Sequence, residues 1–182
     1  MIPGGHFTYT GIGYAYEKYW MRWNERARRA RKRFLAQSDV EILQVDADAF
    51  VQAFRNTKTQ HHFKADYIKY YLRMHNLDAT SVRSFLAVSK TEGPVAGLAV
   101  LDTLNMSTHL VAFTSKNAKL TQAGTGLIDA WYMESLTQGL TYIHFDHLRD
   151  IHMTSDQQGY TDFKLNFIEH TIRYPKCYFQ FW

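Results

Sequence analysis

The sequence predicts an α+β fold in which a mixed, mainly antiparallel sheet is flanked by helices. Three apolar, β-rich runs at 83–90, 95–103 and 107–114 are separated by short turns, which predicts an antiparallel meander. Two glycines and a helix-like stretch follow, and residues 142–146 then have the pattern of another strand. A strand that follows a helix in this way predicts a crossover connection back onto the same sheet.

Composition indicates a globular protein with one main domain. The chain has 182 residues, of which 46% are hydrophobic and 15% aromatic, enough to build a substantial core. Residues 1–13, rich in glycine, are expected to form an extended arm with at most an edge strand, and residues 14–182 the domain. We expect no signal peptide and no membrane-spanning segment, because no apolar run reaches the roughly 20 residues that a membrane helix needs.

The cysteine count bears on location and on metal binding. Cys177 is the only cysteine, which excludes an internal disulfide and a cysteine-based zinc site. A single thiol fits a reducing compartment, so we expect a cytoplasmic protein with Cys177 as a small buried residue. His61 and His62 are adjacent, and neighbouring side chains point apart in helices and strands, so the sequence predicts no metal site there.

The positive charge is concentrated in one element. Segment 22–33 holds seven Arg or Lys residues against one acidic residue, whereas the whole chain has a net charge of only +4. A helix is expected over 15–36, with an apolar stripe that includes Trp20 and Trp23. Four arginines form a second stripe beside it: Arg22, Arg26, Arg29 and Arg33. These arginines are either a solvated face or a contact for phosphates of RNA, a nucleotide or a lipid.

The remaining segments alternate between strand-like and helix-like patterns of apolar residues. Residues 40–45 have the pattern of a strand, and Asp46 or Asp48 can cap the helix that follows. A second helix is expected over 65–75. After the crossover, residues 147–159 are expected to be a loop, 160–170 a helix and 174–182 a final strand.

The segment 119–126 is a candidate anion site. Gly124 and Gly126 allow a ligand to approach the backbone, and the first turn of the next helix offers unpaired N–H groups and partial positive charge. Such a turn is suited to a phosphate, a pyrophosphate or a carbonyl oxygen. The candidate ligand-binding residues are Thr121, Gln122, Gly124, Thr125 and Gly126. The alternative is that this turn is only a connection.

The order of elements resembles the GNAT acyltransferase fold. In that fold a bulged central strand and the next helix N-terminus hold the pantetheine and pyrophosphate of acyl-CoA. The usual loop pattern has Gln or Arg, two residues, Gly, one residue, and Gly or Ala. In this sequence Thr121 stands where Gln or Arg is expected, and Gln122 comes one place later.

A narrower resemblance is to the Fem-type peptidoglycan-bridge aminoacyltransferases and their acetyltransferase-like relatives. Three segments are similar to that family: the arginine run 26–33 before a strand, 139–146 ending in Asp146, and 159–167 with the pattern Gly…Phe-Lys-x-x-Phe. The resemblance extends over about residues 8–182. It implies transfer of an acyl or aminoacyl group to an amine, with acyl-CoA or aminoacyl-tRNA as donor and no tightly bound cofactor. A cell-wall precursor is a possible acceptor. Family members usually carry two such domains, whereas this chain has room for one.

Three polar residues are candidates for the chemistry. Asp146 ends the crossover strand and would accept the amine proton or orient the acceptor; otherwise it caps a turn. His147 would serve as a base near neutral pH, or is simply solvated. By resemblance, Lys164 would neutralise charge on the carbonyl oxygen or bind a phosphate; otherwise it is a surface lysine. No Ser-His-Asp pattern is present, so we expect direct attack without a covalent enzyme intermediate.

Two other kinds of function remain open from the sequence. A catalytically inactive module of this fold would bind RNA or another polyanion through the arginine stripe. A structural protein would bind a partner through its aromatic N-terminal arm. The oligomeric state does not follow from the sequence.

Overall fold

The structure is a computed structural model that describes residues 2–4, 8–57, 64–148, 155–174 and 177–179. The expectations for His61, His62 and the side chain of Cys177 lie outside what it describes. No helix in the described ranges is both long enough and apolar enough to cross a membrane.

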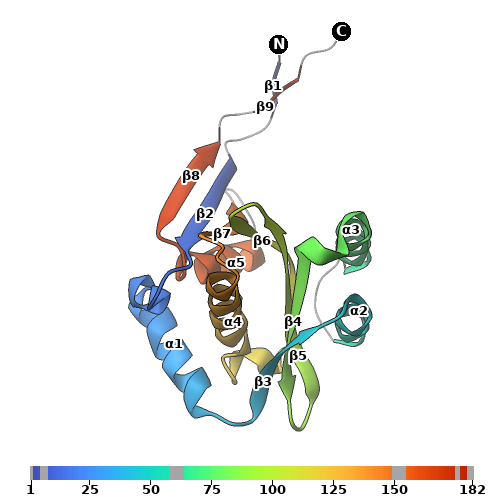
Figure 1. Ribbon diagram of the computed structural model, residues 1–182, viewed down its shortest axis with the longest axis vertical. Coiled ribbons are helices and arrows are strands. Elements are labelled where there is room, and N and C mark those ends of the chain that lie inside the picture. Colours follow the sequence, from blue (N-terminus) through green and yellow to red (C-terminus); the bar gives the residue numbers. More distant parts are fainter. Residues whose placement is uncertain (1, 5–7, 58–63, 149–154, 175–176, 180–182) are drawn as a thin grey trace.

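Seven strands form the main sheet in the order β3-β4-β5-β6-β7-β2-β8 (Figure 1). They are β2 (Thr8–Tyr14), β3 (Val40–Val45), β4 (Val82–Ser89), β5 (Gly93–Thr103), β6 (Met106–Thr114), β7 (Tyr142–Leu148) and β8 (His170–Tyr174). Only the β6–β7 pair is parallel, and the other neighbours are antiparallel. Two short strands, β1 (Ile2–Gly4) and β9 (Cys177–Phe179), pair separately.

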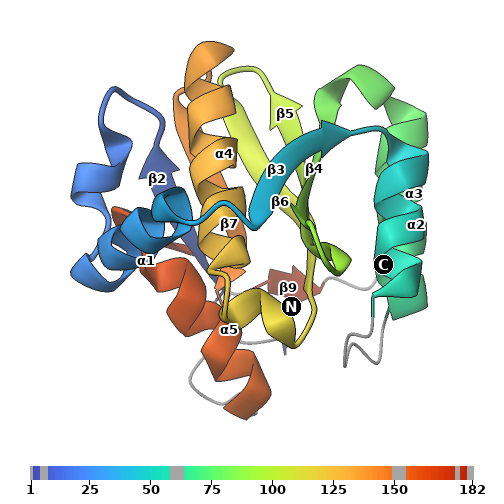
Figure 2. The same cartoon turned by 90° about the horizontal axis from the view of Figure 1, so that it is seen from below.

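Helices cover the two faces of the sheet unequally (Figures 1 and 2). On one face lie α1 (Glu25–Ala36), α4 (Ala123–Thr137) and α5 (Ser155–Leu165), with a core centred on Trp131 and Tyr132. On the other face lie α2 (Ala47–Asn56) and α3 (Lys64–Leu77), packed through Phe50, Phe54 and Tyr71 against β4 to β6. Short 3₁₀ turns are η1 (Tyr19–Arg22), η2 (Ala79–Ser81) and η3 (Asn117–Lys119).

The predicted fold class is confirmed, with the meander as β4–β6, the crossover helix as α4 and its following strand as β7. The Asp46 side chain caps α2, accepting a hydrogen bond of 2.8 Å from the Ala49 amide. A polar residue at this position satisfies one of the amides that the first turn leaves unpaired.

The expectation of an N-terminal arm was wrong from Thr8 onward, because β2 is an interior strand between β7 and β8. Its glycines serve close packing. A Cβ on Gly13 would lie 1.8 Å from the Tyr132 hydroxyl, and one on Gly11 would lie 2.7 Å from Ile168. The glycines that suggested an arm therefore let α4 and the α5–β8 connection pack against the middle of the sheet.

Two helix boundaries also differ from the prediction. The stretch expected as one helix is divided at Asn24, whose side chain accepts a hydrogen bond from the Ala27 amide and starts α1 at Glu25. The last helix is α5, which begins and ends five residues earlier than expected. Its predicted end instead forms β8 because β2 offers an open strand edge, and the pairing runs from Ile12↔His170 to Thr8↔Tyr174.

Candidate active site

The two parallel strands of the sheet separate from each other after a short stretch. β6 and β7 pair only from Met106↔Tyr142 to Thr108↔His144. Beyond this point β6 continues against β5, with an extra residue, Leu110, where the register shifts. β7 continues against β2. The result is a fork between β6 and β7, and it matches the bulged central strand that the GNAT resemblance implied.

Lys164 of α5 is buried inside this fork and is only 3% exposed. Its Nζ donates hydrogen bonds to the carbonyl oxygens of Phe145 and His147, the second at 3.2 Å. Both carbonyls belong to the part of β7 that no longer pairs with β6. The lysine thus supplies donors that the separated strand lacks, and it places a cation at the fork. The alternative of a surface lysine is wrong.

His109 and Tyr160 form a second polar pair in the fork. The Tyr160 hydroxyl and His109 Nε2 are 2.6 Å apart, and Lys164 Nζ lies 4.5 Å from the centre of the Tyr160 ring. Burial holds the pKa of His109 well below its usual value of 6.5, and the nearby Lys164 charge lowers it further. A neutral imidazole is therefore held against a phenol, beside a cation. Nδ1 of His109 is buried without a hydrogen-bond partner among the described residues.

Asp146 lies on a bulge in β7, opposite the single residue Gly11 of β2. Its φ of 55° is in the left-handed region, which aspartate tolerates better than most residues. The Thr10 hydroxyl holds its carbonyl oxygen at 2.6 Å, and its amide donates to Nδ1 of His144 at 3.3 Å. The bulge leaves the Asp146 side chain exposed, next to the carbonyls that bind Lys164.

His147 and His144 lie on the same strand with different surroundings. His147 is half-buried, and it is the residue of β7 that pairs with Thr10. His144 Nε2 is 2.9 Å from the Thr10 hydroxyl, so this histidine is hydrogen-bonded across to β2. Burial lowers the pKa of His144; the Asp146 charge opposes this effect and the Lys164 charge adds to it. The structure therefore brings Asp146, His147 and Lys164 together at one end of β7.

The loop before α4 holds its own shape with local hydrogen bonds. The Thr121 hydroxyl donates to the Ala118 carbonyl at 3.2 Å, and Gln122 Nε2 donates to the Lys119 carbonyl at 2.9 Å. Gln122 is the N-cap of α4 with a φ of 58°, and its side chain makes no capping hydrogen bond. Thr125 is buried in the first turn. The first turn of α4 thus begins without a side-chain cap, which is a feature of anion sites at helix N-termini.

The two glycines in this turn face neighbouring helices. A Cβ on Gly126 would lie 2.4 Å from the Phe34 ring of α1, and one on Gly124 would lie 3.3 Å from the Phe163 ring of α5. Figure 2 shows α1 and α5 next to the N-terminal part of α4. The absence of a side chain at Gly126 therefore serves helix packing, and the expectation that it clears space for a ligand is corrected.

The arginine stripe lies on the outer side of the molecule. Arg22, Arg26, Arg29 and Arg33 are all exposed. Arg22 is 3.9 Å from Glu169, and Arg29 pairs with Glu25 one turn earlier on α1. Arg31, on the neighbouring side of α1, instead binds Asp129 of α4 at 2.6 Å and stacks on Trp20. One arginine of this helix thus fixes α1 to α4, and the stripe faces solvent.

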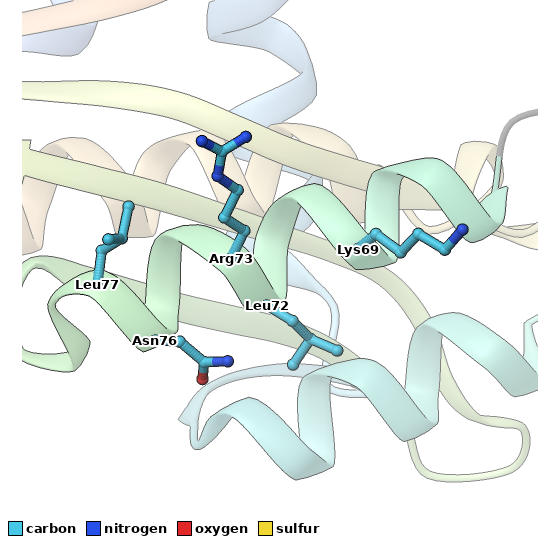
Figure 3. A pocket seen from close by; sticks show the side chains of 5 residues that line it. All are labelled: Lys69, Leu72, Arg73, Asn76 and Leu77. Carbon is cyan, nitrogen blue, oxygen red and sulfur yellow. The ribbon is translucent and has the colours of Figure 1, made fainter.

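Two hollows lie away from the loop before α4. One, of about 470 Å³, is an open depression along α3, bounded by Lys69, Leu72 and Arg73 with two neighbouring residues (Figure 3). The other, of about 290 Å³, lies where β2, β6, β7 and β8 meet. Within the described ranges no group of three His, Cys, Asp or Glu residues is arranged to hold a metal ion.

Sequence reasoning missed His109 and Tyr160 as members of the site. His109 lies within an apolar β-run without a motif, and Tyr160 lies in the 159–167 segment but is not one of the residues that define its pattern. The available signal was the recurrence of Tyr160 and Lys164 at a helical spacing of four, which places both side chains on one face of α5.

Sheet order, the fork and the helix that leaves the bulged strand define the class: this chain has the GNAT fold. In particular, its structure is similar to the crystal structure of FemX, with a TM-score of 0.72 and 11% identity over 92% of this chain. The chain spans about 60% of the length of FemX. No protein-family model matches the sequence, and no curated protein matches it by sequence.

Two further solved structures show the same fold. A GCN5-related glucosamine N-acetyltransferase region of a fungal β-N-acetylglucosaminidase matches 93% of this chain and 20% of that chain, with a TM-score of 0.55 and 9% identity. An aminoglycoside 6'-N-acetyltransferase from Acinetobacter baumannii matches 78% of this chain and 97% of that chain, with a TM-score of 0.50 and 14% identity. Identities this low show likeness of fold.

Proposed function

We propose that this protein is an N-acyltransferase that passes an acyl or aminoacyl group from an activated thioester or ester to an amine at the fork between β6 and β7. The observation that carries the proposal is the cluster at the fork in which buried Lys164 and His109 contact the partly exposed Tyr160. Burying a cation beside a phenol and a neutral imidazole lowers the stability of the fold. Ionisable groups in such environments are concentrated at functional sites. Acyl transfer uses such groups to stabilise charge and move protons.

The reaction assigns a role to each group. The amine nitrogen attacks the acyl carbon, so that a C–N bond forms and the C–S or C–O bond to the carrier breaks. Asp146 or His147 accepts the proton that the amine loses. The Tyr160 hydroxyl gives a proton to the departing sulfur or oxygen, and the Lys164 cation and His109 stabilise the resulting phenolate. The carrier is released directly, without a covalent enzyme intermediate.

The donor is acyl-CoA or aminoacyl-tRNA, and neither needs to stay bound as a cofactor. Thr121, Gln122, Gly124, Thr125 and Gly126 would place the uncapped first turn of α4 against a phosphate of the donor. The Gly126 amide already donates to the Gln122 carbonyl at 3.1 Å, so this contact is assigned to the backbone amides that precede it, those of Gly124 and Thr125. The likeness to FemX supports a cell-wall precursor as the acceptor, and the single cysteine supports a cytoplasmic location.

Transfer of a radiolabel from acetyl-CoA and from charged tRNA to a panel of amines tests the proposal. Tyr160→Phe removes only a hydroxyl, and Lys164→Met removes the charge; we expect each to lower kcat by at least about 10²-fold. Lys69→Met on α3 is the matched control, because Lys69 is an exposed lysine. Thermal unfolding separates a folded inactive variant from an unfolded one. Full turnover in both folded variants would refute the site, and no transfer from either donor would refute the function.

One observation favours a second candidate, a polyanion-binding module. The four exposed arginines on η1 and α1 form a surface to which RNA phosphates could bind. Binding of a tRNA that weakens steeply with salt, and a smaller salt slope after Arg26→Ala and Arg33→Ala, would support it. Arg31→Ala is unsuitable as a control, because Arg31 holds Asp129.

A further inference from the structure

We propose that the hollow between β2, β6, β7 and β8 is a saccharide-binding subsite that seats the acceptor of the transferase. The inference rests on the proposed function for its link to the chemistry at the fork. Its own basis is a set of aromatic and imidazole side chains on one face of the sheet. Five of them line the hollow, Tyr14, Tyr142, His144, His170 and Tyr174, together with Ile12, Met106 and Ile172.

Strand alternation places these side chains on one face. Ser107 and Ile143 point towards α4, as their contacts with Trp131 and the core of that face show. Their neighbours Met106, Tyr142 and His144 must therefore point to the opposite face, the one that α2 and α3 cover farther along the sheet. Among the described residues, those that pack with α2 and α3 lie on β3 to β6, and none lies on β7, β2 or β8.

The exposure of the rings shows that this part of the face is accessible. Tyr142 is 37% exposed and Tyr174 is 46% exposed, although both lie in paired strands. The Tyr14 and Tyr142 rings are tilted against each other with centroids 5.5 Å apart, and the edge of the His170 ring meets Tyr14 at 5.7 Å. Packed in this way, the rings form a preformed aromatic wall around a volume of about 290 Å³.

The chemistry of the wall favours a sugar ring. Aromatic faces pack against the C–H groups of a pyranose, and phenol and imidazole edges can bond its hydroxyls. Among the described residues, the lining of the hollow includes no Lys, Arg, Asp or Glu, so these residues offer no charged group to a phosphate or a free carboxylate. A nucleobase of RNA would also stack on tyrosine, but its phosphates would lack cations at this place. An uncharged or amino-substituted saccharide is therefore the class that fits.

The hollow is next to the proposed chemistry. His144 lines it and is also the last residue of β7 that pairs with β6. Asp146 lies two residues farther along the same strand, about 7 Å at the usual rise. A sugar in the hollow could thus present an amino group towards the fork from the open face, while α5 approaches the fork from the other face.

Isothermal titration calorimetry of the full chain with glucosamine and chitotriose, without any donor, tests the subsite separately from turnover. We expect chitotriose to bind with a Kd of about a millimolar or tighter. Tyr142→Ala and Tyr174→Ala should each weaken binding about fivefold or more, and Tyr142→Phe should retain it because the ring remains. Tyr70→Ala is the matched control, because Tyr70 is an exposed tyrosine on α3. Adenosine monophosphate should not bind there.

The outcomes separate the subsite from the function. Saccharide binding by a natural chain that transfers from neither donor supports the subsite and refutes the proposed function. Transfer to other amines without saccharide binding leaves the function standing and overturns the subsite. A change of oligomeric state by Tyr142→Ala and Tyr174→Ala in analytical ultracentrifugation would show that this face binds a second copy, and would also overturn it. Equal weakening of saccharide binding by Tyr70→Ala would also overturn the subsite.

Discussion

The ring of Phe34 in α1 lies directly against the backbone of Gly126 in α4, so that a Cβ at position 126 would come within 2.4 Å of the ring. This contact joins α1, which lies between β2 and β3 in the chain, to α4, the helix that follows the bulged strand. It also explains why a glycine with an ordinary φ stands in the first turn of a helix, where other residues cost less backbone entropy.

Gly126→Ala should destabilise the fold by about 1–3 kcal/mol, because the added methyl forces Phe34 out of its position. Urea unfolding followed by tryptophan fluorescence measures the change. Gly159→Ala is the matched control, since Gly159 also lies in a helix but has nothing within 4 Å of its would-be Cβ. That change should be neutral or slightly stabilising. Equal stability of the two variants would contradict the packing role.

Arg83 should be a strong determinant of stability. It is buried and binds both Asp102 oxygens, at 2.6 and 3.0 Å, and also Ser107 and Ser135. Arg83→Met leaves the Asp102 carboxylate without its partner and should cost about 3–5 kcal/mol of unfolding free energy.

A second substitution tests the electrostatic origin of that loss. Adding Asp102→Leu to Arg83→Met removes the unpaired charge and should recover part of the stability. Arg28→Ala, at an exposed position of α1, should change stability by less than about 0.5 kcal/mol. If the double variant is no more stable than Arg83→Met, the unpaired Asp102 carboxylate is not the cause of the loss of stability.

Stability should fall in mild acid because of His109. Burial lowers the pKa of His109 in the folded state below 6.5. Below that pH the unfolded chain therefore binds a proton that the folded chain does not bind. The free energy of unfolding therefore decreases as the pH falls below about 6.5 towards the folded-state pKa, and it is unaffected by this group above that range.

His109→Gln isolates this contribution. The variant should show a flatter pH dependence between about pH 6.5 and 5 than the natural chain, measured by urea unfolding at a series of pH values. His144, whose pKa burial also lowers, keeps part of the slope in both proteins. An unchanged slope would mean that His109 titrates normally in the folded protein.

The start of α1 offers a local test. The Asn24 side chain accepts a hydrogen bond of 2.9 Å from the Ala27 amide and donates another to Asn166 near the end of α5. Asn24→Ala should cost about 1 kcal/mol or more, whereas Asn24→Asp should keep the cap. Identical melting temperatures for Asn24→Ala and the natural chain would contradict the assignment.

Much of the architecture was predictable because it rests on local patterns. The alternation in β4 to β6, the short turns between them and the cap at Asp46 are properties of neighbouring residues, and the structure confirms them. The candidate site was predictable only in part. Lys164 was noticed through a motif, but its burial and its bonds to β7 depend on a fork that no local pattern encodes.

The sequence by itself determined the class of fold, the crossover after the meander and the placement of the positive charge on one helix. Only the tertiary structure decided that β2 is an interior strand, that Gly126 makes room for Phe34, and that His109, Tyr160 and Lys164 meet. The physical reason is range: hydrophobic periodicity and caps act over a few residues. Strand pairing and close helix contacts join residues more than a hundred positions apart, such as Thr10 and Asp146.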